Sequence, residues 1–202
     1  MPLKTLPPTG TETADALIQL LNGRGTGDYI GEHISQLEHS LQCAHSAKRS
    51  GSDDELILAA LLHDIGQFLP IEEARDVQML MEGEGSVGRV GHEMIGEEYL
   101  KNLGFGEKVW KLVGSHVAAK RYLTAIDTSY YDGLSEASKQ SLKFQGGPFQ
   151  GEELEQFMRH PLSEDMVKLR KWDDRAKVVG IEGSTPRVEV YRDMMVKHLE
   201  KE

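Results

Sequence analysis

The tract LAALLHDIG (58–66) constrains the fold of this chain more than any other segment. It lies in a nearly continuous apolar run over 55–65, which predicts a central helix that is buried on most sides. The run ends in His63 and Asp64, two ionisable side chains. Burial of such groups without partners is costly, so they need an ion-pair partner or a metal ion. Taken alone, the dipeptide predicts a helix-end salt bridge or cap more often than a metal site.

Composition and charge narrow the class of protein. The chain has 202 residues, of which 39% are hydrophobic and 28% charged, as in a soluble globular domain. It shows no apolar run long enough to span a membrane and no signal peptide, and its single cysteine, Cys43, suits a reducing compartment. We therefore expect a cytoplasmic protein. The net charge of −10 argues against a nucleic-acid partner but not against a small anionic substrate.

Hydrophobic periodicity predicts one all-α domain over 1–202, a helical bundle with 1–12 as a loose N-terminal lead-in. Ser52 or Asp53 is expected to cap the central helix. Residues 69–90 are expected to form a loop or a short irregular excursion, and no strand pair is predicted. The expected helices are 14–22, 30–50, 55–65, 92–103, 107–123, 134–143, 151–159, 163–173 and 189–200.

The His63-Asp64 pair does not stand alone, because further metal-ligand residue types fall on other predicted helices. They are His39 in QLEHS, His92 in GHEMIG, His116 in GSHVAAKRY and Asp173 in KWDD. A metal site in a bundle core takes its ligands from several facing helices in this way.

Lys120 lies four residues after His116. On a helix this spacing places both side chains on one face, one turn apart. A lysine at that position can neutralise an anion bound at the metal. The alternative is a solvated surface lysine.

The order His39, His63-Asp64, Asp173 resembles the H…HD…D pattern of the HD superfamily, and His92 and His116 match the subset that binds two metals. Within that subset the chain is similar to the PhnZ-type mixed-valent di-iron oxygenases, which cleave the carbon–phosphorus bond of 1-hydroxyphosphonates. The matching stretches are DYIGEHISQLEHSLQCA (28–44), LAALLHDIG (58–66), HVAAKRYL (116–123), LSEAS (134–138), QGGP (145–148) and KWDD (171–174).

The resemblance implies an HD-domain helical bundle that holds two iron ions in a mixed-valent Fe(II)/Fe(III) state, with dioxygen as co-substrate. The implied ligands of one iron are His39, His63, Asp64 and Asp173, and those of the other are His92 and His116, with Asp64 bridging. Tyr29 is implied to ligate the second iron until substrate displaces it. The chemistry is assigned to dioxygen at iron, and no separate protein acid or base is assigned.

The resemblance also implies a set of substrate contacts. Glu32 would contact a substrate amino group, Lys120 and Ser138 would bind phosphonate oxygens, and Gln145 would lie nearby. Gln67 departs from the family pattern, where a histidine often follows as HD-x-G-H. Glutamine can donate a hydrogen bond but carries no positive charge. From spacing alone, Tyr29 can equally be a core or turn tyrosine, and Glu32 a helix N-terminal carboxylate.

The implied reaction converts (R)-1-hydroxy-2-aminoethylphosphonate to glycine and phosphate, or hydroxymethylphosphonate to formate and phosphate. Glu32 favours the aminoethyl compound, while the methyl and trimethylammonio compounds stay open. A functionally linked hydroxylase that supplies the hydroxyphosphonate is implied by the resemblance only. Two other functions stay open: an HD-type metal-dependent phosphohydrolase, which uses a metal-activated water, and a binding module without catalysis.

Overall fold

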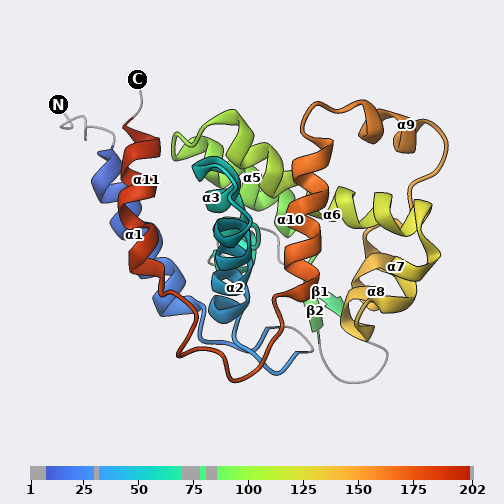
Figure 1. Cartoon of the computed structure of the whole chain (residues 1–202), viewed down its shortest axis with the longest axis horizontal. Helices are drawn as coiled ribbons and strands as arrows, with labels where there is room; N and C mark the ends of the chain where they lie inside the picture. The colour runs from blue at the N-terminus through green and yellow to red at the C-terminus, as the bar shows by residue number, and fades with distance from the viewer. Residues whose placement is uncertain (1–7, 30–31, 70–77, 81–85, 201–202) are drawn as a thin grey trace.

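The computed structural model describes residues 8–29, 32–69, 78–80 and 86–200. Within these ranges the chain is a bundle of α-helices with one small two-stranded hairpin (Figure 1). The predicted all-α fold is confirmed. No helix in the described ranges is long and apolar enough to cross a membrane.

The helices and strands have the following bounds along the chain. The α-helices are α1 (Gly10–Arg24), α2 (Gln36–Arg49), α3 (Asp54–Leu62), α4 (Ile65–Phe68), α5 (His92–Asn102), α6 (Glu107–Ile126), α7 (Thr128–Gly133), α8 (Glu136–Phe144), α9 (Glu152–Arg159), α10 (Ser163–Arg175) and α11 (Arg192–Leu199). The remaining elements are the strands β1 (Gln78–Leu80) and β2 (Ser86–Arg89) and the 3-10 helix η2 (Val188–Tyr191).

Helix α3 forms the centre of the core. Every residue from Leu56 to Leu62 is buried, and α2, α6, α10 and α11 pack around the helix. The Asp53 carboxylate accepts a hydrogen bond from the Leu56 amide at 2.9 Å and so caps the helix. The predicted buried helix and one of its two predicted caps are therefore confirmed.

The bundle has a layered arrangement (Figure 1). Helices α1 and α11 lie side by side at one edge, and α7, α8 and α9 gather at the opposite edge. Between them, α2, α3, α5, α6 and α10 surround the middle of the molecule. The predicted metal ligands come from this middle group.

Two predictions near the middle of the chain are wrong in part. Strands β1 and β2 pair antiparallel within the segment expected to lack strands; the rest of that loop, 70–77 and 81–85, lies outside the described residues. Strands of three and four residues are too short for alternation to be visible in a sequence. The predicted helix over 55–65 is also interrupted, because α3 ends at Leu62 and α4 begins at Ile65.

The other differences between the predicted and the observed helices concern helix ends, one additional helix and one divided helix. Helix α1 begins at Gly10 rather than 14, because Thr9 and Glu12 form a capping box, so the lead-in is shorter than expected and its residues 1–7 lie outside the described ranges. Helix α2 begins at Gln36 rather than 30, after the N-cap Ser35. Helix α7 was not predicted, and the predicted helix over 189–200 is divided into η2 and α11.

Gly66 in α4 allows α5 to approach closely. A Cβ atom at this position would lie 2.1 Å from the backbone oxygen of His92, which cannot move without α5. Gly66→Ala should therefore lower the free energy of unfolding by about 1–3 kcal/mol, the usual cost of overpacking. Urea denaturation followed by circular dichroism measures this change.

Gly23→Ala is the matched control, because a Cβ atom there meets nothing within 4 Å. This change should be neutral or stabilising by up to about 1 kcal/mol, since alanine is the better helix former. Equal stability of the two variants would show that α4 and α5 do not depend on this contact.

Candidate functional site

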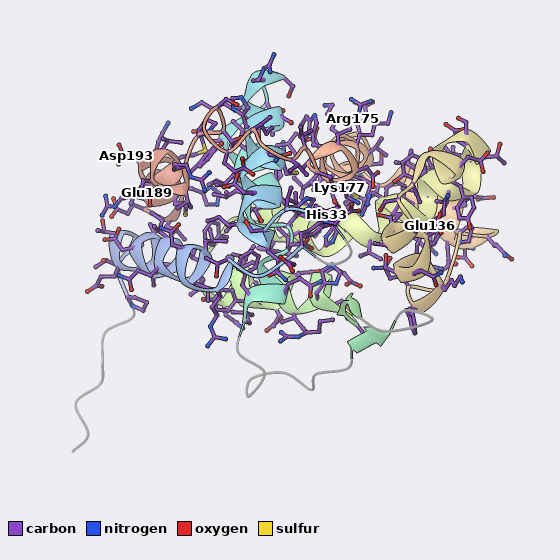
Figure 2. All side chains as sticks on the ribbon, turned by 90° about the horizontal axis from the view of Figure 1, so that it is seen from below. His33, Glu136, Arg175, Lys177, Glu189 and Asp193 are labelled. Carbon is purple, nitrogen blue, oxygen red and sulfur yellow. The ribbon has the colours of Figure 1, made fainter. Side chains whose placement is uncertain are left out.

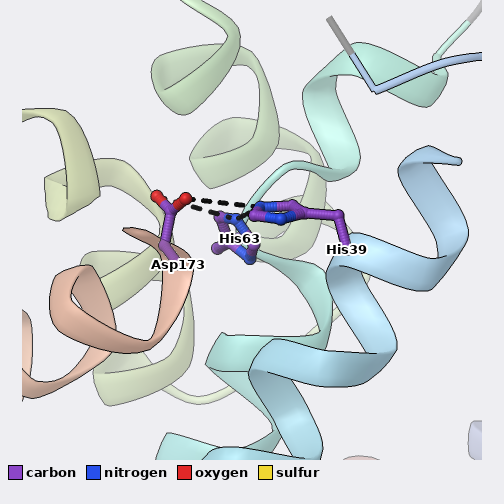
Figure 3. A group of neighbouring side chains, drawn as sticks. All are labelled: His39, His63 and Asp173. Carbon is purple, nitrogen blue, oxygen red and sulfur yellow. Dashed lines mark hydrogen bonds and ion pairs between the residues drawn. The ribbon is translucent and has the colours of Figure 1, made fainter. Parts of the chain in front are cut away.

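Three buried side chains from different helices converge beside the end of α3 (Figure 3). His39 projects from α2, His63 follows the last residue of α3, and Asp173 projects from α10. The two Nε2 atoms of His39 and His63 lie 3.0 Å apart. His39 Nε2 is 3.3 Å from Asp173 Oδ1, and His63 Nε2 is 3.8 Å from Asp173 Oδ2. We call these residues the first cluster.

Asp64, His92 and His116 form a second buried cluster next to the first. His92 begins α5 and His116 lies in the middle of α6. Their Nε2 atoms are 3.0 Å apart, and they lie 3.2 Å and 3.6 Å from Asp64 Oδ1. The second cluster thus repeats the pattern of two imidazoles and one carboxylate.

The two oxygens of Asp64 face different clusters. Oδ1 faces His92 and His116, whereas Oδ2 lies 3.5 Å from His63 Nε2 and 3.8 Å from His39 Nε2. A carboxylate that bridges two metal ions needs this arrangement. The structure therefore brings together all six predicted histidine and aspartate ligands, in the grouping that the sequence resemblance implies.

Each of the four imidazoles is oriented by a backbone carbonyl. His39 Nδ1 lies 2.9 Å from the carbonyl oxygen of Ala176, and His63 Nδ1 lies 2.9 Å from that of Ala60. His92 Nδ1 lies 2.9 Å from the carbonyl oxygen of Arg89, and His116 Nδ1 lies 2.7 Å from that of Val113. A carbonyl only accepts, so each Nδ1 must donate its N–H. In the neutral ring this leaves the Nε2 lone pair free for a metal ion.

The donor set fits metal ions. In each cluster the Nε2 atoms of the two histidines lie 3.0 Å apart. When both rings are neutral and protonated at Nδ1, both Nε2 atoms are acceptors, so they cannot form a hydrogen bond with each other. Two ligands at 90° and about 2.1 Å from one ion are separated by roughly 3.0 Å. In addition, Asp173 Oδ1 is buried and, among the described residues, has no hydrogen-bond partner. A cation in each cluster would satisfy these atoms.

The protonation states of Asp64 and His116 also suit ligation. Burial alone would raise the pKa of Asp64, but the surrounding imidazoles His63, His92 and His116 outweigh it and hold the pKa well below its usual range. Burial, aided by His92, lowers the pKa of His116 to about 3. The carboxylate is therefore ionised and this imidazole neutral near neutral pH.

A small polar cavity of about 50 Å³ opens beside the second cluster. It is lined by the predicted metal ligands Tyr29, Asp64, His92, His116 and Asp173, and by four of the five predicted substrate-contacting residues: Gln67, Lys120, Ser138 and Gln145. Lys120 is 2% exposed, so the alternative of a solvated surface lysine is wrong. Its ammonium donates to Ser141 Oγ at 2.8 Å.

Two predicted site residues make contacts that the sequence did not reveal. The Tyr29 ring stacks on the His39 ring, with centroids 3.8 Å apart, while Tyr29 also lines the cavity. Glu32 does not line the cavity; its carboxylate accepts a hydrogen bond from Lys177 at 2.8 Å. Metal ligation by Tyr29 and amine binding by Glu32 stay predictions.

Sequence reasoning missed three polar residues that line the cavity: Ser141, Arg170 and Lys177. Arg170 Nη1 lies 2.8 Å from Asp173 Oδ2, and its guanidinium also contacts Asp174. Arg170 and Lys177 lie three residues before and four residues after Asp173. For Arg170, the helical spacing to a predicted ligand was the signal that could have found it. Lys177 lies beyond the end of α10 at Arg175, so helical spacing does not identify it.

The shared position of Asp64 predicts a difference in metal content between variants. His116→Ala should lower the metal bound per chain by about one ion, whereas Asp64→Asn should weaken binding at both clusters. Mass spectrometry of metal-reconstituted, desalted protein measures the content. His33→Ala is the control, because His33 is exposed. Full occupancy of the first cluster in Asp64→Asn would contradict the bridging arrangement.

Comparison with known proteins identifies the family. The HD domain family model matches residues 37–142, about half of the chain. A hydroxymethylphosphonate dioxygenase of Gimesia maris is 40% identical over 177 residues, which cover 88% of this chain and 84% of that protein. A glycine-betaine-forming 1-hydroxy-2-(trimethylamino)ethylphosphonate dioxygenase of Leisingera caerulea is 35% identical over 182 residues, covering 90% and 88%.

A further relative is an uncharacterized protein, L432, of Acanthamoeba polyphaga mimivirus. It is 37% identical over 188 residues, which cover 93% of this chain and 82% of that protein. All three matches extend well beyond the HD domain, over most of this chain. The chain therefore belongs to the HD domain family and, within it, to the group that includes these phosphonate dioxygenases.

Proposed function

We propose that this protein is a di-iron oxygenase that cleaves the carbon–phosphorus bond of a 1-hydroxyphosphonate with dioxygen. The observation that supports it is the pair of two-histidine clusters joined by Asp64 and opening onto a cavity with a buried lysine. The relatives named as phosphonate dioxygenases support the same reaction class.

Iron in a mixed-valent state is the cofactor that we propose for the two clusters. Imidazole and carboxylate ligands with open positions suit iron that binds substrate and dioxygen. Each cluster offers two imidazoles and a carboxylate, which leaves room for such positions. When bound, the iron ions would supply the redox chemistry with dioxygen and the Lewis acidity that holds the substrate.

Lys120 and Ser138 are the residues that we propose for the phosphonate. The Lys120 ammonium donates to Ser141 Oγ at 2.8 Å and to the Ser138 carbonyl at 3.5 Å, so one of its three N–H groups remains for an anion in the cavity. The Ser138 hydroxyl oxygen accepts from Ser135 Oγ at 3.2 Å and from Lys177 at 3.2 Å. Because it accepts from both, its own proton is free to be donated to a phosphonate oxygen.

Dioxygen is the oxidant in the proposed reaction, and the substrate supplies all its electrons. The carbon–phosphorus bond breaks, the carbon leaves as a carboxylic acid and the phosphorus as phosphate. Burial of the ligands and the small volume of the cavity would leave little room for bulk water once substrate is bound. A hydroxylation at C1 of a phosphonate is the class of reaction that must supply this substrate.

The direct experiment is phosphate release by iron-reconstituted protein with ascorbate, in the presence and absence of dioxygen. We expect phosphate from hydroxymethylphosphonate or from (R)-1-hydroxy-2-aminoethylphosphonate only when dioxygen is present. An HD-type phosphohydrolase would instead release phosphate from a phosphate ester under anaerobic conditions. Metal binding without turnover of either compound class would favour a binding module.

The buried position of Lys120 predicts a pH dependence of anion binding. Burial, with a further contribution from Arg170, lowers the pKa of Lys120 to about 7. The ammonium is charged below this pH and loses its charge as the pH rises through it. Affinity for an anion should therefore fall above pH 7, by up to about tenfold per pH unit.

Sulfate is a suitable probe, because it keeps its charge between about pH 6 and 9. Calorimetric titration of metal-loaded protein should show weaker sulfate binding at the higher pH. Lys120→Met should bind sulfate weakly at every pH. A fall in affinity with the same slope in this variant would assign the pH dependence to another group.

A further inference from the structure

The Lys177 ammonium is held at one edge of the cavity by three acceptors. Its Nζ atom lies 2.8 Å from Glu32 Oε1, 3.1 Å from Ser135 Oγ and 3.2 Å from Ser138 Oγ. An ammonium has three N–H donors, so these contacts satisfy all of them. Lys177 also lines the cavity, whereas Glu32 does not (Figure 2 labels Lys177 just beyond the end of α10).

The backbone around Lys177 is fixed from both sides. The carbonyl of Ala176 accepts from His39 Nδ1 at 2.9 Å. The Gln42 side chain donates to the carbonyl of Val178 at 2.7 Å and accepts from its amide at 3.0 Å. Both partners lie on α2, so Lys177 is anchored to the helix that supplies a predicted metal ligand.

The position of Lys177 changes what Glu32 can do. A free carboxylate at this edge would attract a substrate with a cationic substituent. Here the carboxylate is engaged by Lys177, and the group that faces the cavity is an ammonium. A second cation placed there would meet like-charge repulsion and could not displace the ammonium without leaving it unpaired.

The other residues that line the cavity also disfavour a cationic substituent. Lys120 and Arg170 add positive charge to the cavity, and Val117 and Ala137 provide its apolar lining. The carboxylates that line it, Asp64 and Asp173, belong to the metal clusters. Among the described lining residues, none is therefore a free carboxylate suited to a substrate ammonium group.

We propose that Lys177 is a specificity-determining residue that engages Glu32 and excludes substrates with a positively charged carbon substituent. The substrate is then a 1-hydroxyphosphonate whose C1 substituent is uncharged, either hydrogen or a short alkyl group. This proposal rests on the proposed function. It also revises the preference for the aminoethyl compound that Glu32 alone suggested.

An isosteric pair of substrates tests the proposal. (R)-1-Hydroxypropylphosphonate carries a methyl group where (R)-1-hydroxy-2-aminoethylphosphonate carries an ammonium. The kcat/KM values for dioxygen-dependent phosphate release should favour the propyl compound by about tenfold or more in the wild-type enzyme. Because the two values come from the same preparation, a partial loss of folded enzyme or iron cancels in their ratio.

Three variants separate the contributions of the two side chains. Lys177→Met should shift the ratio toward the aminoethyl compound by about tenfold, because Glu32 is then free to bind the amine. Glu32→Gln should keep or increase the preference for the propyl compound. The double variant should lose the gain seen in Lys177→Met. Lys168→Met is the charge-matched control, because Lys168 is exposed and, in the described part of the chain, forms an ion pair only with Asp165 on the same helix.

The outcomes distinguish failure of this inference from failure of the proposed function. No dioxygen-dependent phosphate from hydroxymethylphosphonate or from either member of the pair would overturn the function itself. Turnover with a wild-type preference for the aminoethyl compound would overturn only the specificity role. The same holds if the ratio is unchanged in Lys177→Met. If Lys177→Met does not fold, Glu32→Gln decides, since a shift toward the aminoethyl compound there contradicts the proposal.

Discussion

A single carboxylate, that of Asp64, lies between four buried imidazoles, and the local backbone is built around it. Asp64 has φ −99° and ψ 13°, outside the regular helix, at the break between α3 and α4. If α3 continued without interruption, His63 and Asp64 would keep the helical spacing of about 100° between their side chains. The break allows His63 to face the first cluster while the two oxygens of Asp64 face different clusters.

The position of Asp64 also constrains how the neighbouring helices pack. His92 must come close to Asp64, and it begins a helix that packs on α4 at Gly66, where a side chain would collide with the His92 carbonyl. His39 and Asp173 meet the cluster from α2 and α10, and the Ala176 carbonyl just beyond α10 orients His39 in turn. The packing of at least four helices thus depends on the position of one dipeptide.

The sequence predicted the parts of the site that follow from local patterns. An apolar run that ends in ionisable residues identified α3, and histidines on separate helices identified the ligands. Contacts between segments that are far apart in the sequence could not be predicted from such local patterns. Glu32 and Lys177 are 145 residues apart, and no periodicity reports that their side chains meet. The β1–β2 pair and α7 were missed because elements of three to six residues show too little of either period.

The charge distribution shows why the overall composition says little about the ligand. The chain has a net charge of −10, yet Lys120, Arg170 and Lys177 gather at one small cavity. Burying a cation costs free energy, and this cost is offset differently for each of the three residues. Arg170 is paired with Asp173 and Asp174, and Lys177 with Glu32.

Within the described residues, Lys120 has only neutral hydrogen-bond partners, and burial lowers its pKa. A lysine whose pKa is lower in the folded state than in the unfolded chain destabilises the fold below its unfolded pKa, and this cost fades as the pH rises from about 7 toward 10.5. An anion in the cavity removes the same cost by supplying the missing countercharge. The unpaired ammonium therefore couples the stability of the bundle to occupancy of the cavity, and a bound phosphonate stabilises both the charge and the helices that hold it.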